Sequence, residues 1–134
     1  MNTKQALSLD DAKRIAVAAA AEAVKNEWNV TIAVVDDSGH LIYLERMDGA
    51  AKPTSIVASE KARTAALFKR PTLNFEEMLK GGRYGFLTLP GVTAVEGGIP
   101  LIIQNECVGA VGVSGVQSPQ DAQIARAGAA AIGA

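Results

Sequence analysis

Apolar residues recur at helical spacing near the start of the chain and then give way to a β-branched run. The helical positions, spaced mostly three or four apart, are Leu9, Ala12, Ile15, Ala16, Ala19 and Ala23. Ser8 supplies a capping hydroxyl with Asp10 and Asp11 behind it, so the pattern predicts a helix from Ser8 to about Asn26. The run Val30–Val35 predicts a strand that is buried on both faces.

Glycine and proline mark off the next elements. The turn Asp36–Gly39 separates the first strand from a second one over Leu41–Arg46, and the two strands form a hairpin. Pro53 suits the first turn of a helix, which the pattern predicts over Thr54–Phe68. Pro71 then ends this helix, because proline cannot continue the hydrogen-bond pattern.

The second half of the chain is divided by glycines. The pattern predicts a short helix from Thr72 to Leu79, a connection over residues 81–91 and a short strand over Val92–Val95. Strands over Ile99–Gln104 and Cys107–Val113 follow, and Ser118 caps a last helix to about Ile132. The order α-β-β-α-α-β-β-β-α predicts one α/β (α+β) domain over residues 1–134, with helices packed on a mainly antiparallel sheet.

Composition and charge narrow the possible functions. The 134 residues are 49% hydrophobic and carry a net charge of −1, and Lys and Arg form no basic run. This provides a core but no electrostatic basis for binding nucleic acid or an anionic membrane. Cys107 is the single cysteine, which excludes an internal disulfide framework. Alanine is abundant and aromatics are few, so we expect small helix faces that pack against another copy in a homo-oligomer.

The N-terminal segment indicates the cellular compartment of the protein. The segment MNTKQALSLDDAKR has neither the apolar core nor the cleavage site of a signal peptide. No apolar run approaches the roughly 20 residues needed to span a bilayer. We therefore expect a cytoplasmic protein that does not associate with a membrane.

Five phrases in order carry a family resemblance. They are AVVDDSGHLIYLERMDGA at 33–50, SEKARTAALF at 59–68, GGIPL at 97–101, VGAVGVSG at 108–115 and QDAQIARAG at 120–128. The chain resembles the GlcG/HbpS family of heme- and cobalamin-associated proteins, which is similar to the C-terminal domain of PduO-type adenosyltransferases. The resemblance implies a profilin-like sandwich around a five-stranded antiparallel sheet, an oligomer, and heme or a corrinoid as ligand.

Candidate anion-binding residues lie where the second strand meets the second long helix. Arg46 could pair with a carboxylate such as a heme propionate, and Asp48 could orient it. The alternative is that both residues merely pin this chain crossing. Lys61 could join the same site, or it could lie on a solvated helix face.

Glycines suggest where a ligand could approach the backbone. Gly97 and Gly98 either line a pocket or form only a tight turn, and Ser114 is a candidate for the same pocket. The glycines of the last strand do not follow a dinucleotide-binding fingerprint, so close helix packing explains them better.

Few side chains could ligate a metal or transfer a proton. His40, the only histidine, is a candidate axial heme ligand, although its predicted hairpin turn is also a normal place for an exposed polar residue. Tyr43 and Tyr84 are alternatives. The candidate proton-transfer groups are Asp48, Glu96 and Glu106. Cys107 begins an apolar strand and is expected to be a small buried hydrophobe.

Three functional hypotheses follow. The first is an accessory protein that binds heme, a corrinoid or another small anion in a pocket between the sheet and the second long helix. The alternative is a small metabolic enzyme, an isomerase or lyase, that holds a carboxylate substrate on Arg46. The third is a structural oligomer without a ligand.

Overall fold

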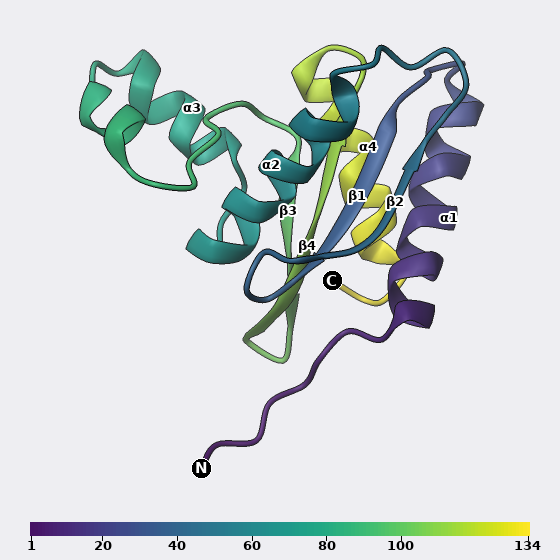
Figure 1. Cartoon of the computed structure of the whole chain (residues 1–134), viewed down its shortest axis with the longest axis horizontal. Helices are drawn as coiled ribbons and strands as arrows, with labels where there is room; N and C mark the ends of the chain where they lie inside the picture. Colours follow the sequence, from purple (N-terminus) through teal and green to yellow (C-terminus); the bar gives the residue numbers. More distant parts are fainter.

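A four-stranded antiparallel sheet forms the middle layer of the computed structural model, which describes residues 1–134 (Figure 1). The strands lie in the order β2-β1-β4-β3. In chain order the elements are α1 (Leu9–Lys25), β1 (Thr31–Asp36), β2 (Leu41–Arg46), α2 (Thr54–Phe68), α3 (Leu73–Lys80), the 3₁₀ turn η1 (Tyr84–Thr88), β3 (Gly98–Ile103), β4 (Glu106–Ser114) and α4 (Ser118–Ala130). The predicted helices and all but one of the predicted strands are confirmed, with bounds that differ by two residues or fewer.

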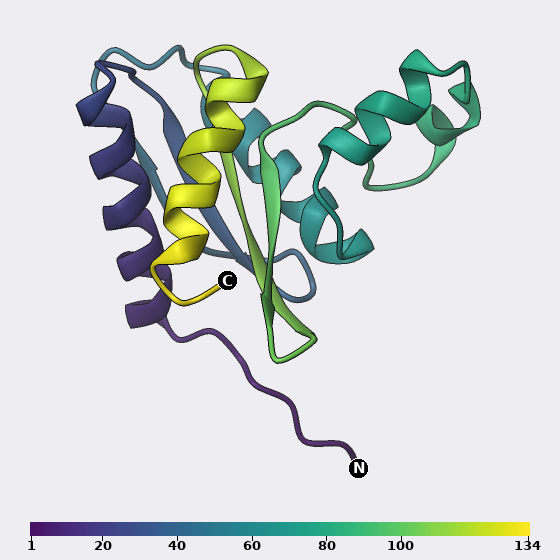
Figure 2. The same cartoon turned by 180° about the vertical axis from the view of Figure 1, so that it is seen from behind.

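Side chains of β1 alternate between two different helix layers. Ile32 and Val34 pack in the larger core cluster with α1 and α4, whereas Ala33 and Val35 pack against α2. Figure 2 shows α1 and α4 side by side on one face of the sheet. The layers are therefore helix, sheet, helix, as the resemblance implied.

Helix α2 lies very close to the sheet because the facing residues are alanine and glycine. A Cβ added at Gly112 would lie 2.1 Å from the carbonyl oxygen of Ala58, and one added at Gly98 would lie 2.3 Å from that of Lys61. This confirms close helix packing for Gly112, whereas a Cβ at Gly109 or Gly115 would instead meet the backbone of Val35 or Asn29. No cavity opens between α2 and the middle of the sheet.

The fifth strand that the resemblance implied is absent, and the short strand predicted over Val92–Val95 is wrong. The backbone of this segment is bonded to side chains instead of to a neighbouring strand. The N–H of Thr93 donates to Oγ1 of Thr64 at 2.8 Å, and that hydroxyl donates to the carbonyl of Gly91 at 2.7 Å. The segment is thereby held to α2 and cannot pair with the sheet.

Capping explains where the outer helices begin. The Ser8 hydroxyl accepts from the N–H of Asp11 at 3.0 Å, and the Asp11 carboxylate accepts from the N–H of Ser8 at 2.9 Å. This reciprocal pair confirms the predicted start of α1. Helix α4 differs from the prediction, because Gln117 and not Ser118 is its cap residue.

The connection over residues 81–91 forms a projecting lobe with α3. The ring of Phe75 meets those of Phe68 and Phe86 edge to face, with centroids 5.1 and 5.7 Å apart. Figure 1 shows α3 and η1 standing away from the sheet. None of the helices combines the length and apolar character needed to cross a membrane.

Candidate functional site

Arg46 and Asp48 are both exposed and line no cavity. Arg46 pairs in register with Thr31, which in turn pairs with Ser114 on its other side. Arg46 and Ser114 therefore share one row across the sheet, with one strand between them. The Ser114 side chain is almost fully buried. The structure does not bring Arg46 together with the glycine turn, which lies at the opposite edge of the sheet.

Lys61 forms a buried ion pair. Its Nζ lies 3.0 Å from Oδ2 of Asp121 and donates to the carbonyl of Val113 at 3.1 Å, and both charged side chains are 2% exposed. Burial raises the pKa of the Asp121 carboxyl above its usual value, and the nearby Lys61 charge opposes this shift. The solvated helix face is thus ruled out for Lys61, whose ammonium is already bound to α4.

Gly97 and Gly98 line a cavity of about 250 Å³, the glycine-turn cavity. Lys61 lies directly behind it, since a Cβ on Gly97 would be 2.8 Å from the lysine Nζ. The remaining wall comes from the residues that flank the two glycines and from two other parts of the chain: Glu96 and Ile99, then Pro71, Leu73 and Asn74, then Ala122 and Arg126. Glu96 is one of the predicted proton-transfer groups, whereas no local sequence pattern indicates that Asn74 or Arg126 lines the same cavity.

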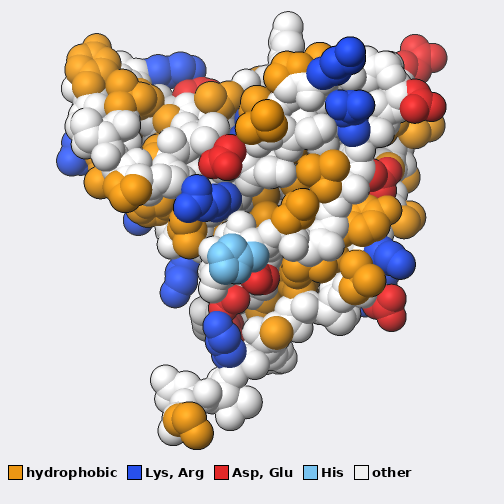
Figure 3. Space-filling model, viewed as in Figure 1, with side chains coloured by type: hydrophobic (Ala, Val, Ile, Leu, Met, Phe, Trp, Pro, Cys, Tyr) orange, Lys and Arg blue, Asp and Glu red, His pale blue; other side chains and the backbone are white.

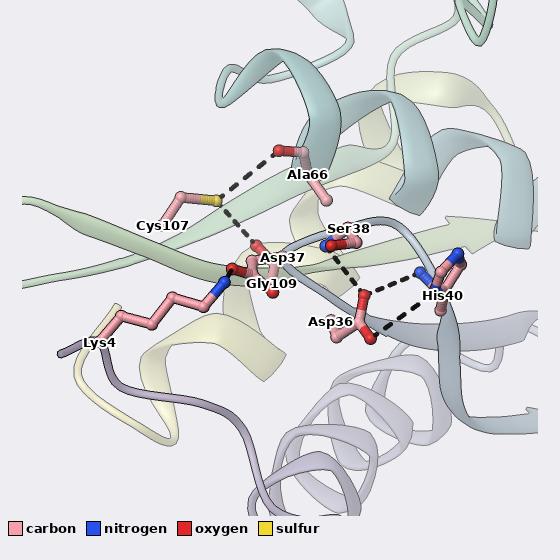
Figure 4. Close-up of polar contacts among 8 residues, drawn as sticks. All are labelled: Lys4, Asp36, Asp37, Ser38, His40, Ala66, Cys107 and Gly109. Carbon is pink, nitrogen blue, oxygen red and sulfur yellow. Dashed lines mark hydrogen bonds and ion pairs between the residues drawn. The ribbon is translucent and has the colours of Figure 1, made fainter. Parts of the chain in front are cut away.

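The candidate iron ligands lie at three separate places. His40 is 82% exposed on the β1–β2 turn, with Nδ1 4.0 Å from Oδ2 of Asp36 (Figures 3 and 4). Tyr43 is half-buried against the α1 side of the core. Tyr84 is exposed and lines a cavity of about 530 Å³ in the projecting lobe. No group of three or more metal-binding side chains is present.

Cys107 is half-buried, so its prediction as a small buried hydrophobe is wrong. The β3–β4 hairpin, whose second strand begins at Glu106, extends past the end of α2 (Figure 1). Its Sγ donates to the carbonyl oxygens of Gly109 at 3.4 Å and Ala66 at 3.9 Å (Figure 4). It shares a cavity of about 500 Å³ with Lys4 and Lys69.

The largest cavity, about 640 Å³, lies under the segment that precedes α1. We call it the strap cavity, after residues 5–7, which form one wall. Its apolar lining is Ala6, Leu7, Ile103, Val108, Ala131 and Ile132, and its other lining residues are Gln5, Asp11, Arg14 and Gly133. The cavity thus joins the two ends of the chain to the β3–β4 hairpin, a meeting that no local sequence pattern predicts.

The strap cavity has one guanidinium and one carboxylate, from Arg14 and Asp11, beside its six apolar residues. Arg14 donates to the carbonyl of Ala131 at 3.1 Å and lies 3.5 Å from Oδ1 of Asp11. Hydrogen bonds from Ser8 hold the pKa of the Asp11 carboxyl below its usual value. Such a wall suits a ligand with an apolar body and a polar edge.

These features define the class, a three-layer α+β domain in which helices cover both faces of an antiparallel sheet. The family model described as "Haem degrading protein HbpS-like" matches residues 7–130, and the chain belongs to this family. The resemblance found in the sequence is therefore confirmed.

Relatives support the same assignment. Protein GlcG of Escherichia coli (strain K12) is 49% identical over 114 residues, which cover 85% of each chain. A double mutant of HbpS from Streptomyces reticuli is 32% identical with a TM-score of 0.91, covering 100% of this chain and 92% of that one. The crystal structure of a PduOC:heme complex is 29% identical with a TM-score of 0.87, covering 96% of each chain.

Proposed function

We propose that this chain is an accessory protein that binds a tetrapyrrole, heme or a corrinoid, in the strap cavity. The wall of that cavity carries the proposal, because six apolar side chains surround about 640 Å³ with Arg14 among them. The volume falls within the range of about 300–1,000 Å³ that is usual for small-molecule sites. The similarity to a PduOC chain crystallised with heme supports this ligand class.

The wall fits the macrocycle better than it fits the iron. Proteins hold heme iron mainly through His, Cys, Met or Tyr, and none of these lines the strap cavity. We therefore expect the apolar ring and its carboxylates to supply most of the binding energy. In this proposal the macrocycle binds without a strong protein ligand to the metal.

Titration with hemin, protoporphyrin IX and cobalamin tests the proposal. Because the ring makes the contacts, hemin and metal-free protoporphyrin IX should saturate the protein with comparable dissociation constants. A Soret change that does not saturate would contradict the proposal. Tight hemin binding without protoporphyrin binding would also contradict it, since the metal would then be the group recognised.

A matched pair of variants locates the site. Leu7 lines the strap cavity, whereas Leu9 is 50% exposed outside it. Leu7→Asp should weaken hemin binding by about tenfold or more, because a charge replaces part of the apolar wall. Leu9→Asp adds the same charge to the first turn of α1 and should leave binding unchanged. Equal effects of the two variants would remove the strap cavity from consideration.

The residues selected from the sequence remain separate predictions. Arg46, Asp48, Lys61 and Ser114 line none of the cavities, so any role they have in anion binding must be tested directly. Arg46→Ala should leave hemin binding intact if the ring occupies the strap cavity. His40→Ala should leave the absorption spectrum of the hemin complex unchanged for the same reason.

The enzyme and oligomer hypotheses also remain predictions. Among the candidate proton-transfer groups, Glu96 and Glu106 line cavities and Asp48 does not. Assembly into a homo-oligomer is supported by exposed apolar side chains on the projecting lobe, notably Tyr84 and Leu87 (Figure 3). Sedimentation velocity with and without hemin measures the assembly directly.

A further inference from the structure

The glycine-turn cavity holds two opposite charges, neither of which is paired within the chain. Glu96 and Arg126 both line it, and neither side chain takes part in an ion pair. The exposed amide of Asn74 lies in the same wall. A carboxylate and a guanidinium that share a cavity but do not pair are available to a ligand that carries both charges.

The other charges near this cavity are already compensated. Beneath its floor, Lys61 and Asp121 neutralise each other across 3.0 Å. The carboxylate of Glu76 accepts from the N–H of Glu96 at 3.2 Å and from Lys80 at 3.3 Å. The field inside the cavity is therefore set mainly by Glu96 and Arg126.

The rest of the wall limits the ligand to a small molecule with a short apolar part. Leu73, Ile99 and Ala122 supply apolar surface. The floor is bare backbone, because Lys61 occupies the space that a Gly97 side chain would need. At about 250 Å³ the cavity is smaller than the roughly 300–1,000 Å³ of sites for drug-sized ligands. Helix α4 and β3, which hold two sides of it, lie next to each other (Figure 2).

We propose that the glycine-turn cavity binds a free α-amino acid with a short aliphatic side chain. Arg126 receives the carboxylate, Glu96 receives the ammonium, and the side chain lies against Leu73 and Ile99. A simple carboxylate would leave Glu96 unmatched, and a simple amine would leave Arg126 unmatched. This site and its ligand class are separate from the tetrapyrrole site, so either proposal can fail without the other.

Calorimetric titration with three compounds that share an isobutyl unit tests the charge requirement. L-valine carries both charges, isovalerate lacks the ammonium and isobutylamine lacks the carboxylate. Valine should bind saturably, and each single-charge analogue should bind about tenfold or more weakly, since each loses one charge-assisted contact. Absence of saturable valine binding, or equal binding of all three compounds, would overturn the proposal.

Variants locate the binding to this cavity. Arg126→Gln and Glu96→Gln should each weaken valine binding by about tenfold or more while hemin titration is unchanged. Arg63→Gln and Glu77→Gln remove the same charges from exposed positions outside the cavity and should leave valine binding unchanged. Loss of valine binding in either control variant, with Arg126→Gln and Glu96→Gln unaffected, would place the ligand elsewhere and contradict the proposal.

Discussion

The strap cavity and the glycine-turn cavity differ in what builds their walls. Much of the strap cavity's wall is formed by residues 5–7 and 131–133, which lie outside the helices and strands. The glycine-turn cavity rests on backbone pressed against Lys61, whose charge is bound beneath it. A wall made partly from chain ends leaves a large space, whereas a wall packed over an ion pair leaves a small one that is lined by the opposite charges of Glu96 and Arg126. The two regions are therefore suited to different ligands within one domain.

Removing one partner of the buried ion pair should produce the largest effect. Asp121→Ala should lower the free energy of unfolding by about 3–5 kcal/mol, because it leaves the Lys61 ammonium buried without a carboxylate. Urea unfolding measures this loss. The double variant Lys61→Met/Asp121→Leu should be far less destabilised, since it buries no charge. A single variant as stable as the wild type would mean that the glycine-turn cavity does not rest on this pair.

Adding a side chain where α2 packs closely on the sheet should have the next largest effect on the free energy of unfolding. Gly98→Ala should lower the free energy of unfolding by about 1–3 kcal/mol, because its Cβ would lie 2.3 Å from the Lys61 carbonyl oxygen. Gly85→Ala is the control, since a Cβ there meets nothing within 4 Å. Thermal unfolding compares the two variants. If both variants lost similar stability, the close packing of α2 would not explain the cost of a side chain at Gly98.

Removing the cap of α1 tests how much this cap stabilises the helix that borders the strap cavity. Ser8→Ala removes the hydroxyl that accepts from the N–H of Asp11, and should lower the free energy of unfolding by about 1 kcal/mol. Ser38→Ala, in an exposed turn where only the backbone N–H is bonded, should change stability little. If chemical denaturation gave the same loss of stability for both variants, the Ser8 cap would not stabilise the start of α1.

The ionisation of two carboxyl groups should have the smallest effects on the free energy of unfolding, with opposite dependence on pH. The pKa of Asp11 is lowered on folding, so its stabilisation is present above the usual carboxyl pKa of about 3.9 and is lost as pH falls below it. The pKa of Asp121 is raised on folding, so the protein loses stability as pH rises from about 3.9 to that raised value.

Unfolding free energies of Asp11→Asn and Asp121→Asn, measured across this acidic range, separate the two contributions. The difference between wild type and Asp11→Asn should grow with rising pH, and the difference for Asp121→Asn should shrink. Parallel curves for the two variants would show that the two cavities do not differ in the environment of their carboxyl groups.

The sequence predicted those parts of the fold that depend on local patterns. Helical spacing and the Ser8 cap predict α1, and the turn at Asp36–Gly39 predicts the first hairpin. Val92–Val95 was mistaken for a strand because its bonding partner, Thr64, lies far away in the sequence. The same limit hid both cavities, since each brings together segments from distant parts of the chain.

Lys61 shows why side-chain roles were harder to predict than elements. Alanines surround it on α2, so helical spacing alone does not tell which side of the helix faces the sheet. Its burial depends on Asp121, which lies 60 residues further along the chain. Arg126 could not be predicted for a related reason, because only the tertiary structure places it in the same cavity wall as Glu96.

The half-buried thiol of Cys107 has a practical consequence. As the single cysteine, it can carry a fluorophore or spin label at one defined position without other substitutions. Lys4 directly precedes residues 5–7 and is paired with Asp37 (Figure 4). It lines the same cavity as this thiol. A label on Cys107 would therefore report displacement of the N-terminal segment in real time while hemin is added.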